Sequence, residues 1–102
     1  MSVDEYIGKA LIKYQTLPQM KQGIEGAAGK CGYIFEYEIE DDMTTLRVLR
    51  PGGKRFFRER NPDTPVVDMT YNDSITSLQG AEIKINVHED ELARKLLVKL
   101  RN

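Results

Sequence analysis

The chain has 102 residues, of which 40% are hydrophobic and 30% charged. These proportions predict one folded domain over residues 1–102 and exclude a disordered tail. Its 15 basic and 16 acidic residues give a net charge of −1, which excludes a long-range field drawing the chain onto nucleic acid or an anionic membrane. One cysteine excludes an internal disulfide, and no apolar run approaches the ~18 residues of a membrane span, so we expect a reduced, cytoplasmic protein.

An amphipathic helix over residues 2–17 is the first predicted element. Ser2 and Glu5 form the S-x-x-E pattern, in which two side chains satisfy free backbone N–H groups at a helix start. The apolar residues that follow recur at three- and four-residue steps, which predicts one apolar face. They are Val3, Tyr6, Ile7, Ala10, Leu11, Tyr14 and Leu17.

A proline and a run of spaced glycines follow this helix. Pro18 is expected to end it, because the residue before a proline is disfavoured in helical geometry. Residues 18–24 are compatible with a further helical turn that directs Met20 and Ile24 inward. The glycines predict a loop from helix into strand; they are Gly23, Gly26, Gly29 and Gly32.

Part of this stretch, residues 26–31, superficially resembles a phosphate-binding loop. Such a loop requires a glycine five residues before its Gly-Lys pair and a hydroxyl residue after it. The chain has Ile24 and Cys31 at those positions. We therefore interpret the stretch as a connection and not as a phosphate site.

A β-hairpin is predicted over residues 33–50. Residues 33–40 alternate between apolar and acidic side chains, the pattern of a half-buried strand, and 44–50 form the returning strand. With Asp41-Asp42 as the turn, Tyr37 lies opposite Leu46, Phe35 opposite Val48 and Glu36 opposite Arg47.

Three more strands and a helix follow. The strands cover residues 54–59, 66–71 and 83–87, residues 72–78 form a short helix or a loop, and the last helix starts at about residue 89 with acids first and bases later. The order predicts an α+β fold: a five-stranded, mainly antiparallel sheet with N- and C-terminal helices packed on one face. The charged reverse face is then open to water or to a partner.

Catalytic, metal and cofactor sites are not evident in the sequence. Cys31 and His88 are the only thiol and the only imidazole, and the sequence does not show that they meet. Several carboxylates could bind a hard cation, although a solvated face paired with Arg47 is the simpler interpretation; they are Glu36, Glu38, Glu40, Asp41 and Asp42. We therefore expect no cofactor and no enzymatic activity.

A basic segment over residues 47–60 interleaves cations with two phenylalanines, a composition that suits single-stranded nucleic acid or a protein partner. Its cations are Arg47, Arg50, Lys54, Arg55, Arg58 and Arg60. The near-neutral charge of the chain argues against nucleic acid, and an outward phenylalanine would equally suit a homodimer interface.

The order of elements from residue 33 onward resembles the sterol carrier protein family. The similar stretches are residues 32–39, 67–73 and 78–85, with Lys95-Leu96 in the final helix. The resemblance implies lipid binding between a curved sheet and covering helices, although residues 72–78 are shorter than the family's tunnel-lining segment. The implied lining is Tyr6, Leu11, Phe35, Tyr37, Leu46, Met69, Leu92 and Leu96, residues that would equally form an ordinary core.

Two functions follow as hypotheses. The first is a non-enzymatic binding domain that holds a small apolar or lipid-like ligand between sheet and helices. The alternative is a protein–protein or nucleic-acid interaction module that uses the open sheet face and the basic segment.

Overall fold

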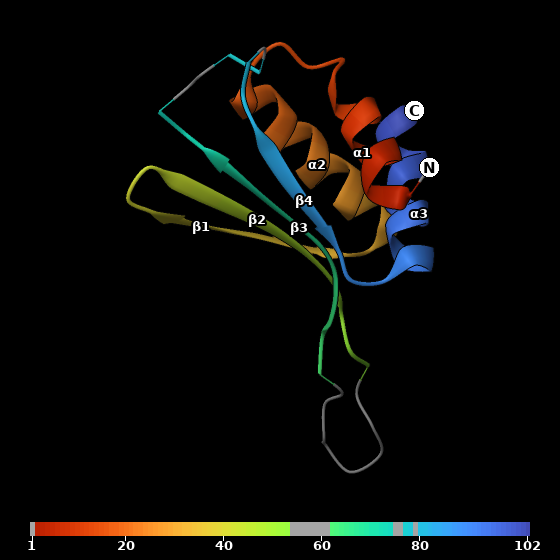
Figure 1. The fold of residues 1–102 in the computed structure, drawn as a ribbon. Coiled ribbons are helices and arrows are strands. Elements are labelled where there is room, and N and C mark those ends of the chain that lie inside the picture. Colours follow the sequence, from red (N-terminus) through yellow and green to blue (C-terminus); the bar gives the residue numbers. More distant parts are fainter. Residues whose placement is uncertain (1, 54–61, 75–76, 79) are drawn as a thin grey trace.

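The computed structural model describes residues 2–53, 62–74, 77–78 and 80–102. Its elements in chain order are α1 (Val3–Leu11), α2 (Leu17–Cys31), β1 (Ile34–Glu40), β2 (Met43–Arg50), β3 (Thr64–Asn72), β4 (Ile83–Val87) and α3 (Asp90–Arg101). The strands form one sheet in the order β1-β2-β3-β4, and every neighbouring pair is antiparallel. The three helices lie on one face of this sheet (Figure 1), which confirms the predicted α+β class and the one-sided helix layer.

The predicted register of the hairpin is confirmed. Tyr37 pairs with Leu46, Phe35 with Val48 and Glu36 with Arg47. The described sheet has four strands instead of five, since β2 pairs directly with β3. The expected strand over residues 54–59 lies outside the described residues.

The first predicted helix ends earlier than expected, and the possible helical turn over residues 18–24, with Met20 and Ile24 inward, belongs to a second helix. α1 ends at Leu11, and α2 begins at Leu17 after the extended residue Thr16. The Thr16 hydroxyl accepts a hydrogen bond from the Gln19 backbone N–H (3.3 Å), so residues 16–19 form the N-terminal cap of a new helix. A T-x-x-Q sequence is itself a helix-start signal, and Pro18 sits in the first turn of α2 where proline is tolerated.

The predicted glycine loop is also wrong, because α2 continues through it to Cys31. Apolar residues at helical spacing bury one face of α2 against the core; they are Leu17, Met20, Ile24, Ala27 and Ala28. Burial of this face outweighs the cost of about 1 kcal/mol for each interior glycine. Gly32 then ends the helix with φ of 74° and donates its N–H to Gly29 O, the left-handed conformation that glycine adopts without strain.

The predicted capping box of α1 is not formed. The Ser2 hydroxyl donates to Glu5 Oε1 (3.2 Å) and makes no side-chain bond to the helix backbone. The acids Asp4 and Glu5 still lie in the first turn, where their charges favour the helix dipole.

The core lies between the sheet and the helix layer. Every helix and the two central strands contribute fully buried side chains, among them Ile7, Ile24, Leu46, Met69 and Leu96. α3 contacts α1, α2 and β3. The Tyr33 hydroxyl donates to Leu92 O (3.1 Å), which fixes the entry into β1 against α3.

The far half of β1 extends beyond the helices. Figure 1 shows the β1–β2 turn reaching past the helix layer. Tyr37 and Ile39 point to the helix side of the sheet, as the alternation predicts, but are 52% and 58% exposed. The expectation of a buried apolar face on β1 is therefore wrong beyond Phe35, because the described helices reach that end only with the start of α2.

Candidate functional site

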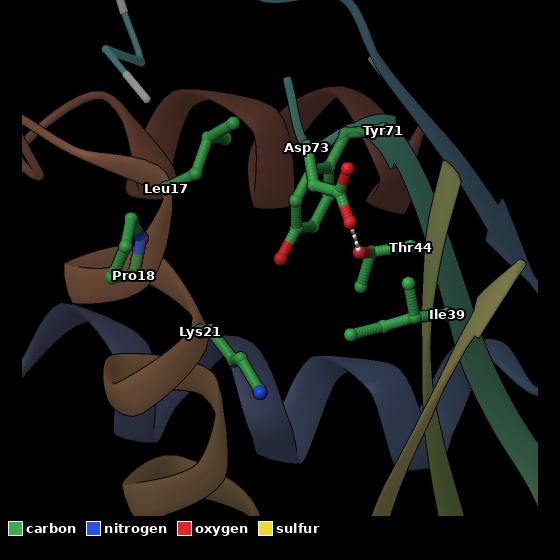
Figure 2. Close-up of a pocket in the computed structure, with 7 residues that line it drawn as sticks. All are labelled: Leu17, Pro18, Lys21, Ile39, Thr44, Tyr71 and Asp73. Carbon is green, nitrogen blue, oxygen red and sulfur yellow. Dashed lines mark hydrogen bonds between the residues drawn. The ribbon is translucent and has the colours of Figure 1, made fainter. Parts of the chain in front are cut away.

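A pocket of about 220 Å³ lies between the start of α2 and the uncovered end of the sheet. Its lining residues come from α2, β1, β2, β3 and the residue that follows β3 (Figure 2). They are Leu17, Pro18, Lys21, Ile39, Thr44, Tyr71 and Asp73. The pocket lies where the first residues of α2 face the ends of β1, β2 and β3.

Apolar side chains form two walls of this pocket. Leu17 and Pro18 stand on the first turn of α2, which the Thr16 cap holds in place. Ile39 on β1 faces them across the opening (Figure 2). An apolar group placed between these walls would be removed from water on two sides.

Tyr71 places a hydroxyl at the inner end of the pocket. The residue is only 4% exposed, yet its hydroxyl has no hydrogen-bond partner among the described residues. The hydroxyl oxygen itself still reaches solvent. Figure 2 shows the hydroxyl directed into the space between α2 and the sheet. Burial, and then the nearby Asp73 carboxylate, raise the pKa of Tyr71 above its ordinary value, so the phenol is neutral and able to donate at physiological pH.

A short hydrogen bond positions the carboxylate beside Tyr71. Thr44, which is 3% exposed, donates its hydroxyl to Asp73 Oδ2 (2.8 Å). The Asp73 backbone N–H donates to Asp42 O (2.7 Å). These two bonds tie the end of β3 to β2 and hold the carboxylate at the rim.

Lys21 supplies a positive charge on the opposite rim. Its Nζ lies 3.3 Å from the centroid of the Tyr37 ring, within the range of a cation–π interaction. The ring therefore holds the ammonium group at the opening between α2 and β1. The site combines two apolar walls, a neutral donor, one cation and one anion.

The residues expected to line a lipid tunnel lie elsewhere. Leu11, Leu46, Met69 and Leu96 are at most 2% exposed, Tyr6, Phe35 and Leu92 pack at the margin of the core, and Tyr37 is exposed. None of them lines the α2–sheet pocket. Leu11 instead borders a separate hollow of about 240 Å³ between α1 and β4, whose described lining carries no charged side chain.

The expected basic patch is only partly described. Arg47 lies on the open face and pairs with Glu38 (3.2 Å), and Arg50 donates to the Thr64 hydroxyl (3.3 Å). Lys54, Arg55, Arg58 and Arg60 lie outside the described residues.

Cys31 and His88 have separate surroundings. His88 Nε2 lies 3.0 Å from Asp68 Oδ2 on the open face. Cys31 ends α2, where burial raises the pKa of its thiol against the opposing effects of Lys99 and Lys95. A raised pKa disfavours the reactive thiolate.

The described residues contain no cluster of three or more histidine, cysteine or acidic side chains suited to a metal ion. Within the same residues, no helix has the length and hydropathy to cross a bilayer.

Comparisons with family models, with curated proteins and with solved structures find no match for this chain. The similarity to sterol carrier proteins thus remains a prediction from the sequence.

The pocket was not predictable by the periodicity that located the strands. Its residues lie at strand ends and in the first turn of α2, a helix whose second half the glycines led us to predict as a loop. Sequence contained one usable signal: Thr16-Leu17-Pro18-Gln19 marks a helix start, and that start forms one wall of the pocket.

Proposed function

We propose that this chain is a non-enzymatic binding domain for a small amphiphilic molecule, held in the α2–sheet pocket. One observation carries the proposal: the Tyr71 hydroxyl, unpartnered among the described residues, points from a buried ring into a hollow with apolar walls. Binding sites typically combine an apolar lining with a few placed polar groups. The pocket between sheet and helices has that composition.

The pocket defines the chemistry of the ligand. A short apolar body fits between Ile39 and the first turn of α2. A hydrogen-bond-accepting end group would meet the Tyr71 hydroxyl, and a negative charge on it would be attracted by the Lys21 ammonium on one rim and opposed by the Asp73 carboxylate on the other. The volume of about 220 Å³ is below the ~300–1,000 Å³ of drug-sized sites, which favours a short chain over a full-length lipid.

The open sheet face supports binding less well. Arg47 is engaged by Glu38 and His88 by Asp68, which takes both side chains away from a ligand. The other charges along β1 on that face are the carboxylates of Glu36 and Glu40, which repel an anionic end group.

Hexanoate, a short carboxylate, is a suitable probe. We expect its titration, followed by NMR, to shift the amide signals of Lys21, Ile39 and Asp73 more than those of the open face. Tyr71→Phe removes one hydroxyl and should weaken binding roughly threefold to tenfold, the effect of one lost hydrogen bond. Native mass spectrometry of the freshly purified protein would report a retained natural ligand.

Filling the pocket with a larger side chain is a second test of the proposal. Ile39→Trp should abolish hexanoate binding, because Ile39 lines the pocket and is exposed enough for a larger side chain. Val98→Trp is the matched control, since Val98 on α3 is 55% exposed and does not line the pocket. Equal hexanoate affinity in both variants would refute the proposal.

A further inference from the structure

β1 forms one edge of the sheet. It pairs with β2 on one side, and no strand borders its other side in the described part of the chain. The backbone N–H and C=O groups along that side are thus available to an incoming strand.

This edge has only one of the usual protections against strand addition, its acidic charges. Edge strands are commonly blocked by proline, by charged side chains and lysine above all, by a bulge or by short length. β1 contains neither proline nor lysine, and its register with β2 is continuous from Ile34 to Glu40. The opposite edge, β4, is shorter and carries Lys84.

The two faces of β1 differ in chemistry. On the helix side, Tyr37 and Ile39 are about half exposed. On the open side, Glu36, Glu38 and Glu40 form an exposed acidic row, in which Arg47 pairs with Glu38. A strand laid beside β1 meets apolar groups on one face and carboxylates on the other.

We propose that the β1 edge binds an extended segment of a partner protein in which basic residues alternate with apolar ones. Its backbone adds a fifth strand to the described sheet. Because side chains alternate between faces, its apolar residues pack beside Tyr37 and Ile39 while its lysines or arginines face the acidic row.

The same charges exclude a second copy of this chain. Two β1 strands paired antiparallel about Glu38 place Glu36 of each opposite Glu40 of the other. Like charges directly opposite are destabilising in a sheet, whereas opposite charges stabilise it. The acidic row therefore rejects self-pairing and selects a cationic strand.

A labelled peptide of about nine alternating lysine and valine residues, long enough to span β1, tests the proposal. Fluorescence anisotropy should show binding at low salt that weakens as the ionic strength rises, because the charge pairs are exposed. Hydrogen exchange of the β1 amides should slow on binding. A peptide of the same composition with its lysines in one block should bind at least tenfold more weakly, since it cannot alternate.

Charge reversal distinguishes the edge from a general charge effect. The double variant Glu36→Lys/Glu40→Lys should lose roughly tenfold in affinity, because attractive cross-strand pairs become repulsive. Glu25→Lys/Glu82→Lys changes the net charge equally at exposed sites outside β1 and should bind like the unmodified chain. Tyr71→Phe should also bind the peptide normally, which separates this edge from the pocket.

Three results would overturn the proposal. One is equal loss of affinity in both charge-reversal variants, and another is equal binding of the alternating and block peptides. The third is sedimentation showing that the unmodified chain dimerises through β1, which would make a second copy the occupant.

Discussion

Tyr71 links the pocket to the alkaline stability of the fold. Its folded-state pKa lies above the ordinary value of 10.0, first through burial and then through Asp73. Between the unfolded and folded pKa values only the unfolded chain has released this proton, so the free energy of unfolding decreases as pH rises above about 10. Urea titrations at about pH 9 and pH 11 should show a smaller decrease for Tyr71→Phe than for the unmodified chain. An identical decrease in both would contradict this assignment.

Gly23 and Gly26 occupy the same helix but different surroundings. A Cβ at Gly23 would overlap the phenol of Tyr14, whereas a Cβ at Gly26 would meet nothing within 4 Å. Thermal or urea unfolding should therefore show Gly26→Ala stabilising by about 0.5–1 kcal/mol. Gly23→Ala should lose this gain, because the Tyr14 phenol must move aside to make room.

Removing the obstructing ring supplies the control for this comparison. In a Tyr14→Ala background, Gly23→Ala should become stabilising, since the overlap is gone. If Gly23→Ala stabilises the unmodified chain as much as Gly26→Ala does, Tyr14 does not restrict this position.

The residues that precede α1 and α2, Ser2 and Thr16, should differ in how much their replacement by alanine lowers the free energy of unfolding. Thr16 accepts a bond from the Gln19 N–H, and Thr16→Ala should lower the free energy of unfolding by about 1 kcal/mol. The Ser2 hydroxyl bonds only to the Glu5 side chain, at an exposed position, so Ser2→Ala should cost less than about 0.5 kcal/mol. Equal losses in urea unfolding would show that the Thr16 bond does not set the start of α2.

The elements differ in how far the sequence determined them. The hairpin was predictable to its register, because alternation and the Glu36–Arg47 pairing point to the same alignment. α2 was predictable only in its first turns, because the later glycines oppose a helix locally, and the apolar contacts that stabilise the rest come from distant elements. Periodicity at Met20, Ile24 and Ala28 was present but competed with a stronger local signal.

Across the whole molecule, hydrogen exchange should follow the position of each strand. β2 and β3 are central and contribute buried residues, so their amides should exchange most slowly. Residues 37–40 of β1, at an edge and beyond the helices, should exchange much faster, at the low-stability end of the molecule. Equal protection of β1 and β2 measured by NMR would show that the uncovered end is as stable as the core.

The candidate site belongs to this molecular scale as well. Its lining residues come together only when the start of α2 packs over the ends of the strands. No spacing pattern in the sequence links Lys21, Ile39 and Tyr71. The sequence therefore led to the hypothesis of a ligand between sheet and helices but assigned its lining to residues that do not border this pocket. Several of the residues predicted to line the ligand site are fully buried, and packing in the core already explains why they are apolar.

The last helix completes the helix layer, and this matters during synthesis. α3 contacts α1, α2 and β3, so the apolar surfaces of α1 and α2 that face it stay exposed to water until residues 90–101 have left the ribosome and packed. A nascent chain that lacks α3 should accordingly be more prone to aggregate than the folded protein.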